Sequence, residues 1–103
     1  MSIEDEFEDA CRDAIDECRR MTPRYIPSAW IQMIERYGAV EAARRVVVSG
    51  DIQSGFKELV GRGRSNLTIE AAVLNPRWES LFDTQIQQAA RWRLSQAGID
   101  NEP

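Results

Sequence analysis

Apolar side chains recur every three or four residues between Ser2 and Met21, which is the period of an α-helix with one buried face. This stripe consists of Ile3, Phe7, Ala10, Cys11, Ala14, Ile15, Cys18 and Met21. Ser2 and Asp5 have the spacing of a capping box, and Pro23 cannot continue a helix. The pattern therefore predicts an amphipathic first helix within residues 1–21.

Two further helices are predicted within residues 28–48. The prolines of residues 22–27 favour an extended connector. Ser28 can then cap a helix that ends at Gly38, because glycine readily adopts the positive φ of a helix end. The next helix is expected over residues 39–48, but its last three residues are β-prone valines, which leave the position of its end open.

Shorter helices separated by glycine and proline are predicted in the second half of the chain. A turn at residues 49–51 should precede a helix over residues 52–60, and the glycines of residues 61–64 should interrupt it. Residues 67–74 are predicted to form the next helix. Its N-cap is expected to be one of three polar residues, Ser65, Asn66 or Thr68.

The last part of the chain carries clear helix-start signals. Asn75-Pro76 favours a further helical turn, because Asn suits the N-cap and Pro the first helical position. Thr84 and Gln87 have the spacing of a capping box for a final helix, and Gly98 can end it. Residues 100–103 are expected to form a frayed tail.

These patterns predict an all-α protein. No convincing strand alternation is present, and 103 residues suit one domain. We expect residues 1–103 to form a single helical domain, an irregular compact bundle of five to seven short helices. No apolar run approaches the roughly 20 residues of a membrane span, and the acidic N-terminus does not resemble a secretory signal. The sequence therefore predicts a cytoplasmic protein with no membrane partner.

Candidate catalytic and metal-binding residues are sparse. The chain has no histidine, and Cys11 and Cys18 are seven residues apart, about 10 Å along a helix and beyond disulfide reach. Both cysteines are expected to be small core residues. Neither a common zinc site nor a His-activated nucleophile can be assembled. We therefore expect no catalytic residues, no metal, no cofactor and no enzymatic activity, and interpret Glu70 as a structural ion-pair partner of Arg64.

Acidic residues are concentrated at the N-terminus. Residues 1–18 carry eight acids and one arginine, whereas residues 19–99 carry twelve basic residues and seven acids. The first helix could present carboxylates to a basic partner, lie against the protein's own arginines, or be an ordinary solvated face. The acids that we assign to the predicted partner surface are Glu4, Asp5, Glu8, Asp9, Asp13 and Asp16.

Trp92 is a second candidate for partner binding. It falls off the apolar stripe of the last predicted helix and lies between Arg91 and Arg93. Tryptophan and arginine contribute strongly to interface energies, so an exposed Trp92 would suit a partner surface. The alternative is that Trp92 belongs to a second buried stripe.

Twelve of the thirteen basic residues are arginine, which forms planar, bidentate contacts with carboxylate or phosphate. Genomic base composition can produce the same bias. The glycine-rich residues 61–64 could bind phosphate through two arginines and backbone N–H groups, or could simply end a helix. A nucleic-acid-binding surface would use Arg44, Arg45, Arg62, Arg64, Arg91 and Arg93.

Several short runs along the chain carry a family resemblance. They are Tyr25-Ile26-Pro27, Trp30-Ile31-Gln32-Met33, Gly38, Val40-Glu41-Ala42-Ala43-Arg44, Ser54-Gly55-Phe56, Gly63-Arg64, Leu67-Thr68-Ile69-Glu70-Ala71, Val73-Leu74, Pro76 and Leu81-Phe82. In these runs the chain resembles an uncharacterised family of small α-helical domains of bacteria and phages. The resemblance implies an association with nucleases and other conflict systems, without a mechanism. The family has Leu-Asp where this chain has Ser65-Asn66, so a role for that acid does not carry over.

Together these observations predict a non-catalytic protein-binding module. The partner would be another protein, a toxin, nuclease or defence complex, and this chain would act as an immunity, antitoxin-like or phage-type inhibitor protein. The alternative is a nucleic-acid-binding or nuclease-accessory module that uses the arginines. The sequence leaves the oligomeric state undetermined.

Overall fold

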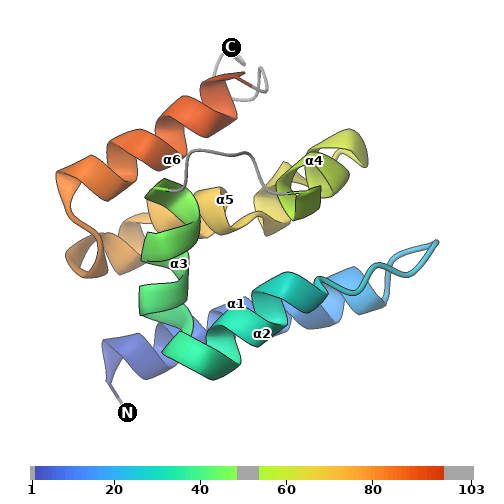
Figure 1. Cartoon of the computed structure of the whole chain (residues 1–103), viewed down its shortest axis with the longest axis horizontal. Helices are drawn as coiled ribbons and strands as arrows, with labels where there is room; N and C mark the ends of the chain where they lie inside the picture. Colours follow the sequence, from blue (N-terminus) through green and yellow to red (C-terminus); the bar gives the residue numbers. More distant parts are fainter. Residues whose placement is uncertain (1, 49–53, 97–103) are drawn as a thin grey trace.

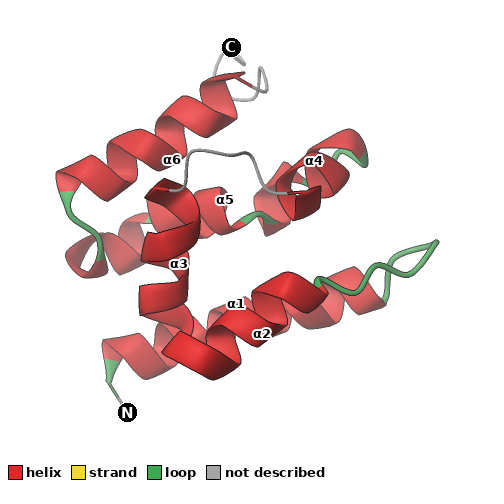
Figure 2. Ribbon diagram, viewed as in Figure 1, coloured by secondary structure: helices red, strands yellow, loops and turns green. Residues whose placement is uncertain are grey.

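The computed structural model describes residues 2–48 and 54–96, and all regular secondary structure in this part of the chain is helical (Figures 1 and 2). The predicted all-α fold is therefore confirmed. The helices are α1 (Ile3–Arg19), α2 (Ser28–Tyr37), α3 (Ala39–Val48), α4 (Ser54–Gly61), the 3₁₀ helix η1 (Ser65–Leu67), α5 (Ile69–Leu74), the 3₁₀ helix η2 (Pro76–Leu81) and α6 (Thr84–Gln96). No helix in these ranges is long and apolar enough to cross a bilayer.

The start of α1 has the predicted capping box. The Ser2 side chain accepts a hydrogen bond from the backbone N–H of Asp5, and the Asp5 carboxylate accepts one from the backbone N–H of Ser2. Two N–H groups that have no partner within the helix are thereby satisfied. The apolar stripe faces inward, with Phe7 and Ile15 among its buried residues.

The boundary between α2 and α3 lies at Gly38, as the sequence predicts. Gly38 has a φ of 79°, in the region that favours glycine, and its N–H donates to the carbonyl of Ile34. Ser28 does not cap α2; it is already the first helical residue, and Pro27 occupies the cap position without a side-chain hydrogen bond. Val47 near the end of α3 is helical and buried, because tertiary packing outweighs its modest β-preference.

Local polar side chains set the helix starts in the second half. Thr68, one of the three predicted caps, accepts a hydrogen bond from the N–H of Ala71 at the start of α5. Asn75 caps η2 by accepting from the N–H of Arg77, with Pro76 at the first helical position as expected. These local interactions fix the short connections between helices.

The start of α6 differs from the prediction by one residue. Thr84 is the first helical residue, and the carboxylate of Asp83 accepts the backbone N–H of Ile86 in the role expected of Thr84. The side chain of Gln87 donates to the carbonyl of Phe82 instead of closing a capping box. The predicted turn at 49–51, the stop at Gly98 and the tail at 100–103 lie outside the described residues.

The helix α3 is the central element of the fold. It contacts α1 and α2 near one end of the molecule and α5 and α6 toward the other, so it joins two groups of helices (Figure 1). Its inward face carries small residues, and Ala42 and Ala43 are fully buried. Small side chains allow neighbouring helices to approach closely.

Aromatic residues from distant parts of the chain form the centre of the core. The Phe7 ring on α1 is fully buried and meets the rings of Trp78 and Phe82 edge-on, with centroid distances of 5.6 and 5.2 Å. Burying a phenylalanine contributes about 1.5–3 kcal/mol, and each edge-to-face pair adds about 0.5–1.5 kcal/mol. This aromatic cluster holds α1 against η2 and against Phe82, the residue that follows η2.

Candidate functional site

Two acids on one flank of α1 attach this helix to the rest of the protein. Glu6 Oε1 accepts a hydrogen bond from Arg77 Nη2 at 2.8 Å. Glu17 Oε2 accepts one from Arg64 Nη2 at 2.7 Å. Part of the acidic helix therefore lies against the protein's own arginines, which was one of the three alternatives drawn from its charge.

Glu8, on the opposite flank, has a structural contact that the sequence does not reveal. Its Oε1 accepts the backbone N–H of Ala39, the first residue of α3, at 3.2 Å, and its Oε2 pairs with Arg12 at 3.3 Å. The N–H group of Ala39, at the start of α3, has no acceptor within the helix, so the Glu8 carboxylate satisfies it. The negative charge also complements the positive N-terminal end of the α3 dipole. Glu8 therefore has a structural role, fixing α3 to α1, that its assignment to a partner surface did not include; its side chain remains partly exposed.

The remaining acids form an outward row on α1. Asp5, Asp9, Asp13 and Asp16 are exposed and follow one another at spacings of four, four and three residues, so adjacent members lie on the same face. Asp5 also contributes to the capping box. We call these four residues the aspartate row. Within the described part of the chain, no cationic side chain forms an ion pair with them.

Glu4 is exposed on the first turn of α1, four residues before Glu8, and so lies on the flank of Glu8 beside the aspartate row. Five of the six acids assigned to the partner surface are thus on the outside of the molecule. Local like-charge contacts along the row disfavour the helix by a few tenths of a kcal/mol each. Apart from Asp5, which helps to cap α1, the row is therefore tolerated by the fold without contributing to its stability.

Trp92 is exposed, with 58% of its surface accessible, which decides between its two interpretations in favour of a surface position. It lies on α6, whereas the aspartate row lies on α1, and these helices are at opposite ends of the molecule with α3 between them (Figure 1). The structure therefore does not bring Trp92 and the acids together into one surface. A partner that contacts both would have to span the fold.

Arg93 is wrongly assigned to a nucleic-acid surface. It is 2% exposed, and its Nη1 donates a hydrogen bond to Glu70 Oε2 at 2.9 Å. The expected pairing of Glu70 with Arg64 is also wrong, because Arg64 contacts Glu17 on α1. Glu70 and Arg93 instead join α5 to α6 inside the protein.

The other candidate arginines do not form one basic surface. Arg44 and Arg45 on α3 both contact Glu41, and Arg44 also donates to the carbonyl of Leu81. At the end of α4, Arg62 pairs with Glu58 one turn earlier, which fits the interpretation of residues 61–64 as a helix end. Arg91 is exposed on α6, where it forms no ion pair with the described residues.

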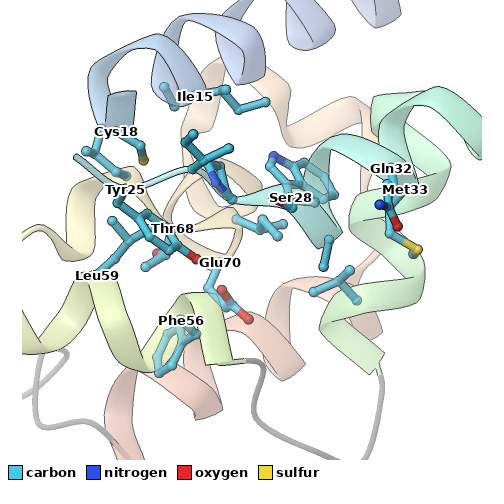
Figure 3. A pocket seen from close by; sticks show the side chains of 18 of the residues that line it. Ile15, Cys18, Tyr25, Ser28, Gln32, Met33, Phe56, Leu59, Thr68 and Glu70 are labelled. Atoms are coloured by element: carbon cyan, nitrogen blue, oxygen red, sulfur yellow. The ribbon is translucent and has the colours of Figure 1, made fainter. Parts of the chain in front are cut away.

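A cavity of about 650 Å³ lies between α2 on one side and α4, η1 and α5 on the other. Figure 3 shows Tyr25 and Leu59 at one side of this space, Gln32 and Met33 at the other, and Glu70 between them. No pattern in the sequence predicts this cavity. Ile26, in the connector before α2, lines its wall and is exposed, which the sequence alone does not reveal.

Both cysteines are buried and free, as predicted. Burial raises the pKa of Cys11 to about 12, and the nearby Glu8 carboxylate acts in the same direction. Burial also raises the pKa of Cys18, an effect that the Arg64 guanidinium opposes. Cys18 lines the cavity, so the two thiols differ in their surroundings. Among the described residues that line the cavity, Glu70 is the only carboxylate.

Comparisons with protein-family models, with curated proteins and with solved structures find no match to this chain. The family resemblance therefore depends only on the sequence runs quoted for it.

Proposed function

We propose that this protein is a non-catalytic binding module that meets a basic surface of another protein through the aspartate row of α1. The observation that supports this proposal is that the acids of α1 fall into two groups, one bound within the protein and one facing outward. Glu6, Glu8 and Glu17 are used to hold α1 in place, whereas the aspartate row points outward and forms no ion pair with the described residues. The helix is thus fixed on its flanks and presents its negative charge on its outer face.

Charge on a rigid helix suits recognition by electrostatic complementarity. Aspartate has a short side chain, so the position of its charge is set largely by the backbone. A row of such charges attracts a basic partner before contact and increases the association rate. The neighbouring cations Arg12 and Arg20 are paired with Glu8 and Glu17, so they do not form ion pairs with the row.

The class of partner that best fits an acidic helix is a protein that itself binds nucleic acid. Nucleic-acid-binding surfaces are basic because they contact phosphate, and an acidic face can occupy the same surface. We therefore propose that the partner is a nuclease, toxin or defence complex and that this chain blocks it, as an immunity, antitoxin-like or phage-type inhibitor protein does. The resemblance to domains found beside nucleases favours the same class.

Direct nucleic-acid binding has weaker support. Arg93 is buried, and Arg62 and Arg64 already pair with carboxylates of the same chain. The other three of the six candidate arginines are exposed but lie on different helices, Arg44 and Arg45 on α3 and Arg91 on α6. The protein also carries a formal net charge of −4, which disfavours approach to phosphate.

Affinity capture from lysate of the source cells, followed by mass spectrometry, tests the proposal with two matched charge variants. The first, Asp9→Lys with Asp13→Lys, reverses the centre of the aspartate row. The control, Glu35→Lys with Glu79→Lys, makes the same change in net charge at exposed positions on α2 and η2. Circular dichroism verifies that both variants fold.

We expect the wild type and the control to capture the same basic protein, and the row variant to lose it. With the purified pair, affinity should fall as salt concentration rises, because screening weakens exposed charges. Capture that survives reversal of the row, or that both variants lose equally, would contradict the proposal. Binding of DNA or RNA with a steep salt dependence would favour the arginine alternative instead.

A further inference from the structure

The cavity beside α2 has the size and walls of a small-molecule site. Its volume of about 650 Å³ lies within the range of roughly 300–1,000 Å³ that is typical of ligand pockets. Apolar side chains from five α-helices and η1 line it, including Ile15 of α1, Met33 of α2, Val46 of α3, Phe56 of α4 and Ile69 of α5. Such walls favour a ligand with an apolar body.

The polar groups at the inner wall are already engaged within the protein. Thr68 is 3% exposed; its hydroxyl donates to the carbonyl of Ser65 and accepts the N–H of Ala71. The Glu70 carboxylate, 1% exposed, accepts a hydrogen bond from Arg93. Because these groups already have partners, the interior favours an apolar chain over a polar one.

Two arginines give the cavity its positive charge. Arg36 and Arg45 line it, and both guanidinium groups lie over the ring of Tyr37, at 5.3 and 4.0 Å from the ring centroid. Arg45 also contacts Glu41, with Nε and Oε2 3.1 Å apart. Arg36 has no carboxylate partner among the described residues. One aromatic ring thus holds two like charges beside an apolar space.

We propose that this cavity binds a linear amphiphile, an acyl chain that ends in a carboxylate. The chain occupies the apolar space between α2 and α4, and the carboxylate accepts hydrogen bonds from Arg36, with Arg45 adding to the positive potential. Charge complementarity favours a negative head group. The charged side chains among the described lining residues are Arg36, Arg45 and Glu70, and Glu70 is already paired with Arg93. The inference is independent of the aspartate row.

Isothermal titration calorimetry with three chain-matched compounds tests the head group. Decanoate, decanol and decyltrimethylammonium carry the same apolar chain with negative, neutral and positive heads, and are used below their micelle-forming concentrations. Arg36→Gln removes the proposed partner of the carboxylate. Arg91→Gln, an exposed arginine on α6 away from this cavity, is the matched control. Ala29→Phe places a large side chain at an exposed position of the cavity wall.

Saturable binding of one decanoate per chain, tighter than that of the other two compounds, is the expected result. Arg36→Gln should weaken decanoate about tenfold and leave decanol unchanged, because a charge-assisted hydrogen bond is lost. Arg91→Gln should change neither, and Ala29→Phe should weaken both. Thermal unfolding followed by circular dichroism verifies that the variants are folded.

Three outcomes would overturn the proposal. One is the absence of saturable binding to the folded wild type. Another is equal binding of the three head groups, or an equal effect of Arg36→Gln and Arg91→Gln on decanoate. The third is a dimer in sedimentation velocity that dissociates on Met33→Glu, because a second copy of the chain would then cover the cavity.

Discussion

Arg93 of α6 and Glu70 of α5 form an ion pair inside the protein, with Nη1 and Oε2 2.9 Å apart and side-chain exposures of 3% and 1%. Removing two charges from water costs several kcal/mol per ion, and their attraction offsets this cost only when they are paired. The pair therefore makes the packing of α5 against α6 specific: either charge would be strongly destabilising without the other.

This pair gives a first prediction. Arg93→Met leaves the Glu70 carboxylate buried without its cationic partner and should lower the free energy of unfolding by about 3–5 kcal/mol. The double variant Glu70→Met with Arg93→Met removes both charges and should be more stable than Arg93→Met alone. Urea unfolding followed by circular dichroism measures both. The single variant Glu70→Met completes the cycle, and a loss in the double variant equal to the sum of the two single losses would contradict the assigned coupling.

A second prediction contrasts two acids of α1. Glu8→Ala removes the acceptor for the N–H of Ala39 and should destabilise the protein by about 1 kcal/mol. Asp13→Ala removes one charge from the aspartate row, so relief of like-charge repulsion and the higher helix propensity of alanine should raise stability slightly. Chemical unfolding of both variants at low salt gives the comparison. Equal stabilities for the two would show that Glu8 does not fix α3.

A third prediction follows from the pKa of Cys11, which burial raises from 9.0 to about 12. Between these values the folded state retains a proton that the unfolded state has lost, so stability falls as pH rises, by about 1.4 kcal/mol per pH unit. Below pH 9 both states are protonated and this contribution to the pH dependence is absent. Urea unfolding between pH 8 and pH 11 under reducing conditions measures the slope.

Cys11→Ala provides the control for this slope. The variant is expected to be less stable at neutral pH because of the cavity it leaves, but its stability should fall less steeply above pH 9. Cys18 and Tyr25, whose pKa values burial also raises, contribute equally to both proteins. Identical slopes in the two proteins would mean that the Cys11 thiol ionises as freely in the folded state as in the unfolded one.

A fourth prediction concerns the three tryptophans. Trp92 is 58% exposed and Trp78 is 3% exposed, so a neutral quencher such as acrylamide should reach the Trp92 indole readily. Trp92→Phe should remove most of the quenchable fluorescence and shift the remaining emission to shorter wavelength. The same substitution at Trp30, which is half-buried, is the comparison. A larger loss of quenchable fluorescence in that variant would place Trp92 inside the protein.

Much of the secondary structure could be predicted because its causes are local. The Ser2–Asp5 capping box, the glycine at the α2 boundary and Asn75-Pro76 at the start of η2 each involve groups at most four residues apart. Their geometry depends on neighbouring residues, which the sequence shows directly. The shift of the α6 cap from Thr84 to Asp83 is an error of the same local kind: both residues can cap a helix, and the sequence does not decide between them.

The candidate sites were only partly predictable, because a charged residue has different roles depending on what packs against it. The sequence identified the acidic helix, but Glu8 meets a backbone group 31 residues away and Glu6 meets an arginine 71 residues away. Arg93 is in an arginine-rich helix segment whose composition is typical of an exposed surface. It is nevertheless buried against Glu70, which lies 23 residues earlier in the chain. No local pattern marks such contacts.

The sequence by itself determined the helical character of the protein, most of its helix boundaries and the concentration of acid in α1, because hydrogen bonding and periodicity act over one or two helical turns. Only the tertiary structure decided which acids point outward, that Trp92 is exposed while Arg93 is buried, and that a cavity lies beside α2. These properties depend on how α3 and α5 place distant helices against one another, and the relative orientation of packed helices is set by the fit of whole surfaces.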